Sequence, residues 1–278
     1  MIFYVFAFKE KKYYAVFIKN KKNIIVLSLK VTKMNSLPCK IKKCPIIETV
    51  LEIRYASDFP VDAIFGVLYA SIKEFFTEKP ISLPILQLPE IVRKQDPNFK
   101  YQAHHKLSNE NIILNIGPNV LTFMNLTPYI GWSEWSQFFY AALQKIEQTK
   151  IITNVERVGL KYINFFDENI FDKINFEAKI NNSILKREST NLRTEIFDDE
   201  FIKILQIGNA VNVKKEGKDM NGSIIDIDCL FNIDDSSDFF ANCNEIIEAA
   251  HIKEKTLFFS LLKKTFLDEL EPIYGEQS

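Results

Sequence analysis

The chain has 278 residues, with 35 Lys and Arg against 36 Asp and Glu, which gives a formal net charge of −1. Hydrophobic residues make up 47% and charged residues 26%, a composition typical of a folded globular protein, so a wholly disordered chain is excluded. No apolar run reaches the roughly 18–20 residues of a membrane-spanning helix, so we expect no membrane partner. No glycine-rich phosphate loop of either common pattern occurs.

The four cysteines are too few for a disulfide scaffold in a chain of this length. Lysines interrupt the apolar residues of the N-terminal segment, which does not fit a secretory signal. We therefore expect a cytoplasmic protein with reduced thiols. Cys39 and Cys44 have no second close cysteine pair at the spacing of a zinc site, so we also expect no cofactor.

Positive charge is concentrated in residues 1–33, which carry eight Lys and one Glu, while the remaining 27 basic and 35 acidic residues give a net charge of −8. Arg occurs at only five positions, and Lys is a weaker substitute for reading base edges and clamping phosphates. This acidic body with few Arg makes nucleic-acid binding possible but disfavoured.

Met34 opens a stretch that resembles a natural start, and we predict that residues 1–33 are an extension that translation from Met34 would omit. The alternative is an N-terminal hairpin with strands at 13–18 and 23–29. We divide the rest into a first half, residues 34–150, and a second half, residues 151–278.

The first half is predicted to contain a strand, a helix, a three-stranded meander and a second helix. Residues 48–55 alternate, with Thr49, Leu51, Ile53 and Tyr55 on one face. Pro60 begins a pattern of apolar residues at three- and four-residue spacing, which is typical of a helix. The remaining elements are strands at 100–107, 112–116 and 120–126 and a helix at 132–150.

A similar order recurs in the second half. We predict a strand at 155–166, a helix at 168–179, strands at 201–207, 210–215 and 223–232, and a long C-terminal helix at about 238–270 that breaks near Lys253. The expected fold is therefore α+β, with antiparallel sheets, packed helices and two related β-α-β-β-β-α halves.

Three segments carry a resemblance to known proteins. They are Pro45–Tyr55 with its Glu-Ile-Arg-Tyr ending, Tyr129–Trp135 with Tyr-x-Gly-Trp, and Glu156–Asn164 with Arg-Val-Gly-Leu-Lys-Tyr-x-Asn. The chain resembles a sporadically distributed bacterial family of about 250–270 residues with no established function. Lys161 and Trp135 depart from the family pattern, which has Arg and Phe there. The resemblance implies the fold and an accessory or phage-defence context, but it supplies no catalytic residues.

Asp226 and Asp228 are the sharpest candidates for chemistry. Residues two apart on a strand point the same way, so both carboxylates would lie on one face, with Asp234 and Asp235 close behind. Carboxylate pairs of this kind can hold Mg²⁺ in phosphoryl-transfer enzymes. The alternative is a solvated strand face.

Two further groups are candidates for binding. A polar cluster of Glu48, Glu52, Arg54, Arg157, Lys161 and Asn164 could orient a ligand, or it could form structural ion pairs if the two similar strands lie side by side. Trp132 and Trp135 would share one helix face and could anchor a protein partner.

The histidines offer little catalytic chemistry. His104 and His105 should point to opposite faces of a strand, and His251 has no Ser or Cys partner at a recognisable spacing. The leading expectation is therefore a non-enzymatic protein that binds a partner protein or self-associates. A metal-dependent nucleotide or nucleic-acid enzyme that uses Asp226 and Asp228 is the alternative.

Overall fold

The computed structural model describes residues 2–7, 13–20, 23–30, 37–181, 183–184, 189–215, 217–233 and 239–275. The centre of the molecule is a nine-stranded antiparallel sheet with the order β13-β14-β15-β10-β5-β9-β8-β7-β6. Its strands are β5 (Ile46–Ala56), β6 (Ile81–Ser82), β7 (His105–Asn109), β8 (Ile112–Gly117), β9 (Val120–Leu126), β10 (Asn154–Phe166), β13 (Asn191–Asp198), β14 (Phe201–Lys215) and β15 (Lys218–Asn232).

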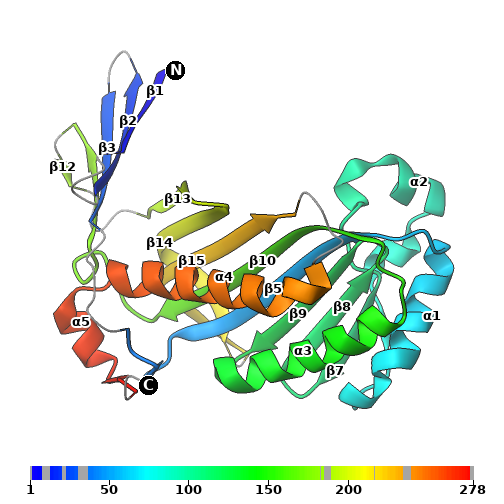
Figure 1. The fold of residues 1–278 in the computed structure, drawn as a ribbon. Coiled ribbons are helices and arrows are strands. Elements are labelled where there is room, and N and C mark those ends of the chain that lie inside the picture. The colour runs from blue at the N-terminus through cyan, green and yellow to red at the C-terminus, as the bar shows by residue number, and fades with distance from the viewer. Residues whose placement is uncertain are drawn as a thin grey trace.

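Helices cover one face of this sheet, with α3 and α4 lying across it and α1 beside α3 (Figure 1). The helical segments are α1 (Val61–Ile72), η1 (Lys73–Phe75), η2 (Pro84–Gln87), α2 (Glu90–Gln95), η3 (Pro97–Phe99), α3 (Trp132–Gln148), α4 (Phe239–Leu261) and α5 (Lys264–Glu269). None of the helices in the described ranges has the length and apolar character needed to cross a bilayer.

Two smaller sheets complete the fold. One has the order β1-β2-β3-β11-β12 and the other pairs β16 with β4. Their strands are β1 (Ile2–Ala7), β2 (Tyr13–Asn20), β3 (Asn23–Lys30), β4 (Lys40–Ile41), β11 (Phe176–Ile180), β12 (Ser183–Ile184) and β16 (Pro272–Ile273). The expected hairpin at 13–29 is therefore present as β2 and β3, whereas Met34 lies outside the described residues and translation from it stays a prediction.

The alternation of residues 48–55 explains the central strand β5. Thr49, Leu51, Ile53 and Tyr55 are each fully buried against the helices, as expected. Pro60 precedes α1, where a missing backbone N–H costs nothing, and Asp62 lies in the first turn near the positive end of the helix dipole. The sheet face that points away from α3 and α4 carries the charged residues of β5, and we call it the polar face.

The buried side chains form two clusters between the helices and the sheet. The first joins α1, α3 and the N-terminal part of α4 to the strands of the first half and to β10, and it includes Leu51, Trp135 and Phe139. The second joins the C-terminal part of α4 and α5 to β14 and β15, and it includes Ile207, Ile225 and Leu261.

The strand order supports the repeat, but the two halves build one sheet. From the adjacent pair β5 and β10 outward, β9, β8 and β7 on one side mirror β15, β14 and β13 on the other. The predicted helix at 168–179 is wrong, because residues 176–180 are β11 and pair with β3. Between β10 and β13, the described residues of the second half form no counterpart of α1.

Four other elements differ from what the sequence predicts. β14 runs through Gly208 and Asn209, where we predicted a turn, because a bulge with Ala210 at φ 51° keeps it paired with β15. β13 was not predicted, and β7 begins at His105 rather than at residue 100. The long helix α4 is continuous through Lys253 and ends at Leu261, and two residues separate it from α5.

Candidate functional site

The polar face has an ion-pair cluster where the two halves meet. β5 and β10 lie side by side, with Leu51 opposite Leu160 and Glu52 opposite Gly159. Glu52 Oε1 accepts hydrogen bonds from Arg54 Nε at 2.7 Å and from an Arg157 guanidinium nitrogen at 2.6 Å. The three side chains are only 25–27% exposed. The Glu52 carboxylate therefore forms ion pairs with two guanidinium groups, one from β5 and one from β10.

The loop before β7 covers one end of this cluster. The guanidinium of Arg54 lies 4.3 Å from the ring centre of Tyr101, a cation–π arrangement. The Tyr101 hydroxyl donates to Glu156, whose carboxylate also accepts from Lys100 Nζ at 3.1 Å. These contacts hold the loop over the end of β5 and β10 and restrict the side chain of Arg54.

A second ion pair lies farther along the polar face. Lys161 Nζ is 2.9 Å from Asp226 Oδ2, and the Asp226 side chain is 11% exposed. Burial raises the pKa of Glu48 and of Asp226, and the nearby Lys161 opposes both shifts. Asn164 is separate from this pair, because it is buried and its side chain donates to the backbone carbonyl of Ile225 at 3.3 Å.

Asp226 and Asp228 do share a face, but their surroundings do not resemble a metal centre. Within the described ranges, no group of three or more His, Cys, Asp or Glu is placed to hold a metal ion. The Lys161 ammonium already provides a positive charge beside the Asp226 carboxylate, where a metal ion would have to bind. Burial raises the pKa of Asp228 to about 6, partly offset by Lys161 and Arg157. Asp234 and Asp235 lie outside the described residues.

The proposed surface role of the tryptophans needs correction. Trp135 is fully buried and has no exposed surface to offer a partner. Trp132 is half-buried and its ring stacks on His251, with the ring centres 3.9 Å apart. Its indole N–H donates to Glu248 at 3.0 Å. Both tryptophans face inward because α4 packs against the N-terminal turns of α3.

A polar network inside the helical layer was not predicted. The Tyr162 hydroxyl lies 3.2 Å from His251 Nδ1 and 3.4 Å from the Tyr129 hydroxyl. Burial lowers the pKa of His251 to about 3, so the ring is neutral near pH 7. The three residues come from β10, α4 and the loop before α3, so no spacing in the sequence could bring them together.

Glu254, one turn after His251, is 4% exposed. Burial raises its pKa to about 8, although the neighbouring Lys255 acts in the opposite direction. A carboxyl group with this pKa is mostly protonated at pH 7 and can occupy an apolar site without a counter-ion. Glu254 therefore lies inside the layer between the sheet and α4, which packs on β10 and β15.

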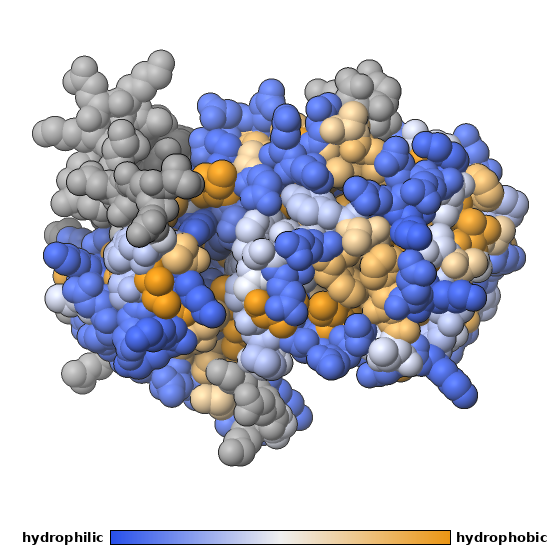
Figure 2. All heavy atoms as spheres, turned by 60° about the horizontal axis from the view of Figure 1, so that its bottom comes forward, coloured by the Kyte–Doolittle hydropathy of each residue, from blue (hydrophilic) through white to orange (hydrophobic). Residues whose placement is uncertain are grey.

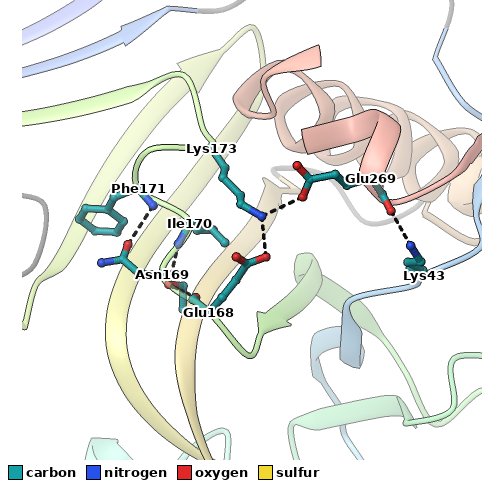
Figure 3. A network of polar contacts seen from close by, with 8 residues as sticks. Lys43, Glu168, Asn169, Ile170, Phe171, Lys173 and Glu269 are labelled. Carbon is teal, nitrogen blue, oxygen red and sulfur yellow. Dashed lines mark hydrogen bonds and ion pairs between the residues drawn. The ribbon is translucent and has the colours of Figure 1, made fainter. Parts of the chain in front are cut away.

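Another polar network anchors the short helix α5, which follows α4 (Figure 3). Lys173 Nζ pairs with Glu168 at 2.9 Å and with Glu269 at 2.8 Å. Lys43 Nζ donates to the backbone carbonyl of Glu269 at 3.1 Å. A cavity of about 480 Å³ lies beside these residues and is also lined by Phe166. Ion pairs and hydrogen bonds engage Lys43, Glu168 and Glu269 at this cavity, so we assign the network a structural role.

The two edges of the nine-stranded sheet differ in length and exposure. β6 forms one edge with two residues, while β13 forms the other with eight. Phe197 on β13 is 70% exposed, the highest value among the large hydrophobic residues of the described ranges. On the side of the molecule shown in Figure 2, hydrophilic side chains surround several separate hydrophobic patches. Among the described residues, β13 is therefore a long edge strand that carries an exposed aromatic ring and has no neighbouring strand on its outer side.

His104 and His105 also differ from expectation. Because β7 begins only at His105, the two rings do not simply alternate, and both line one cavity of about 280 Å³.

Comparison of the chain with family models and with curated proteins gave no match. The resemblance to a bacterial family therefore stays a prediction, and the site residues rest on geometry alone.

Proposed function

We propose that this protein is a non-enzymatic binding component that takes up an extended segment of a partner protein along the edge of β13. The observation that carries the proposal is an eight-residue edge strand with Phe197 exposed by 70%. Edge strands present unpaired backbone groups to which another chain can add as a further strand. The accessory or defence context implied by the resemblance is compatible with such a role.

The first half of the chain supports this choice of occupant. By strand order, β13 corresponds to β7, and β7 is paired with β6 from the same chain. The position equivalent to β6 next to β13 is left open in the described sheet. A partner strand at β13 would therefore complete the second half as β6 completes the first.

The side chains of β13 indicate what the partner segment should contain. Phe197 offers an apolar contact, which a hydrophobic side chain placed opposite would cover. Arg193 and Glu195 form an exposed pair at 3.0 Å on the same strand. An extended segment with one apolar anchor and alternating polar residues fits this edge, while backbone hydrogen bonds supply most of the affinity.

The test is affinity isolation of the full chain from its native host, with the bound proteins identified and quantified by mass spectrometry. Phe197→Lys should remove the partner, because a charge at the anchor position is costly to bury. Ile91→Lys is the matched control, since Ile91 is 63% exposed on α2, which lies by the opposite edge of the sheet (Figure 1). Both variants should change the free energy of unfolding by less than about 0.5 kcal/mol.

Hydrogen exchange on the isolated complex distinguishes strand addition from other binding modes. The amides of β13 that point away from β14 should exchange more slowly in the complex. A partner that Phe197→Lys still retains, or that leaves these amides unprotected, would contradict the proposal. A protein isolated alone with bound metal or nucleotide would instead favour the enzyme alternative at Asp226 and Asp228.

A further inference from the structure

A cavity of about 280 Å³ lies between α1, the segment around α2, and the β7–β8 strands. Its walls are partly apolar, with Ile64, Phe65 and Ile116 among the lining residues. The polar lining comes from Arg93, with His104, His105 and Asp62. Ligand sites in proteins are typically concave and mostly apolar with a few convergent polar groups, and this volume suits a small ligand.

Arg93 has donors to spare in this cavity. Its Nε donates to the backbone carbonyl of Leu88 at 3.2 Å, and one terminal nitrogen lies 3.5 Å from His104 Nδ1. A guanidinium has five N–H donors and no acceptor, so three donors remain. Among the ion pairs of the described ranges, none involves Arg93. Glu90 is near enough for Arg93 to help lower its pKa, but no described carboxylate lies within ion-pair distance of the half-buried guanidinium, which is therefore suited to bind an anion.

The histidines complete the polar wall. His104 is 8% exposed, and because Arg93 can only donate, His104 Nδ1 is the acceptor in their contact. The His105 ring stacks on Phe65 at 3.7 Å, and its Nδ1 is buried with no hydrogen-bond partner in the described part of the chain. Burial, with help from Arg93, lowers the pKa of His104 to about 4, so its ring is neutral near pH 7.

We propose that this cavity binds a small organic carboxylate, whose oxygens accept hydrogen bonds from Arg93 and whose hydrocarbon part lies against Phe65 and Ile116. The planar fork of a guanidinium matches the two oxygens of a carboxylate. Asp62 is exposed at the same cavity and disfavours a second negative charge, which argues for a monoanion over a phosphate dianion. The site is distant in the fold from β13, because it lies by the opposite edge of the sheet.

The experiment compares benzoate with its neutral analogue benzamide on the full chain by NMR. The chain has three histidines, so the ring signals of His104 and His105 can be assigned by single substitutions. Benzoate should shift both signals saturably at millimolar concentration, while benzamide should bind at least about tenfold more weakly, because it lacks the charge. If the wild-type protein binds the two compounds with equal affinity, this comparison alone overturns the proposal.

Two arginine variants test the contact itself. Arg93→Gln should weaken benzoate binding by at least about tenfold. The matched control is Arg193→Gln on β13, which should bind benzoate like the wild type. Arg93→Lys keeps the positive charge but not the planar fork of the guanidinium. This variant replaces Arg93→Gln if the amide NMR signals of Arg93→Gln show that it is unfolded. Unchanged affinity in the Arg93 variants would overturn the site, as would the absence of a saturable shift with both benzoate and acetate.

Discussion

The two halves of the sheet share one strand order and end differently. From the β5–β10 junction outward, the first half closes with the short strand β6, whereas the second half ends at β13. The strands of the second half are also longer, with 15 residues each in β14 and β15 against six and seven in β8 and β9. The two halves therefore match in strand order next to the junction and differ at the outer edges of the sheet.

The helical layer shows the same contrast. The residues that α3 buries carry no charge, whereas α4 buries Glu254. After β5 the chain forms α1, but after β10 it forms β11 and β12, which join the sheet that contains β3. In the described sheet the first half ends with β6, while the second half ends at the open edge of β13 and is covered by a helix that buries a carboxyl group.

The largest expected change in the free energy of unfolding comes from comparing one glycine of each half. A Cβ on Gly222 in β15 would lie 2.0 Å from the backbone oxygen of Phe166, whereas a Cβ on Gly66 in α1 would have nothing within 4 Å. Gly222→Ala should therefore destabilise the protein by about 3 kcal/mol or more, because backbone must move. Gly66→Ala should stabilise it by about 0.5–1 kcal/mol. Urea unfolding of both variants measures the difference.

An effect of Gly222→Ala below about 1 kcal/mol would mean that the ends of β10 and β15 can separate freely. The long strands of the second half would then be less tightly joined than their register indicates. Gly66→Ala serves as the internal control, since it repeats the same chemical change at an uncrowded position.

The next effect compares an ion pair at the junction with one at the edge. Glu52→Gln should cost about 1–2 kcal/mol, because it leaves Arg157 and Arg54 without their shared carboxylate in a half-buried site. Glu195→Gln removes the exposed partner of Arg193 and should cost less than about 0.5 kcal/mol. Thermal unfolding at two salt concentrations checks both values, since only the exposed pair should be screened strongly. Equal costs would show that the junction is solvated.

The sequence was most informative where one face of an element is buried. The alternation in β5 and the spacing after Pro60 predicted both elements and the sides they bury. β13 was missed because an edge strand needs few apolar residues, and its Arg, Thr and Glu hide the pattern. The predicted helix at 168–179 failed because its segment pairs with a strand near the start of the chain, a contact that local pattern cannot reveal.

The candidate sites were predictable to different degrees. The strand likeness around Glu52 and Arg157 suggested that the two residues could be neighbours, and the register places them so. The cavity at Arg93 was not foreseen, because its residues come from three separate segments with no motif. The exposure of Phe197 depends on which strand lies at the edge, and only the assembled sheet determines that.

The smallest effect concerns the buried carboxyl of the second half. The pKa of Glu254 is raised from 4.5 to about 8 by burial, so the folded state holds a proton that the unfolded state has released. The contribution of Glu254 to the free energy of unfolding is therefore largest below about pH 4.5 and is lost as the pH rises towards 8. Between pH 7 and 8 the free energy of unfolding should fall by about 1 kcal/mol.

Two other groups with large pKa shifts add little to the change between pH 7 and 8. Asp228, with a pKa of about 6, is already ionised in both states, and His251, with a pKa of about 3, is neutral in both. Urea unfolding at pH 7.0 and 8.0 should show the fall in the wild type and in Glu245→Gln, an exposed control on the same helix. Glu254→Gln should abolish it, because an amide does not titrate. A slope that survives this substitution would show that Glu254 is ionised within the folded core, and the contrast between α3 and α4 would lose its electrostatic basis.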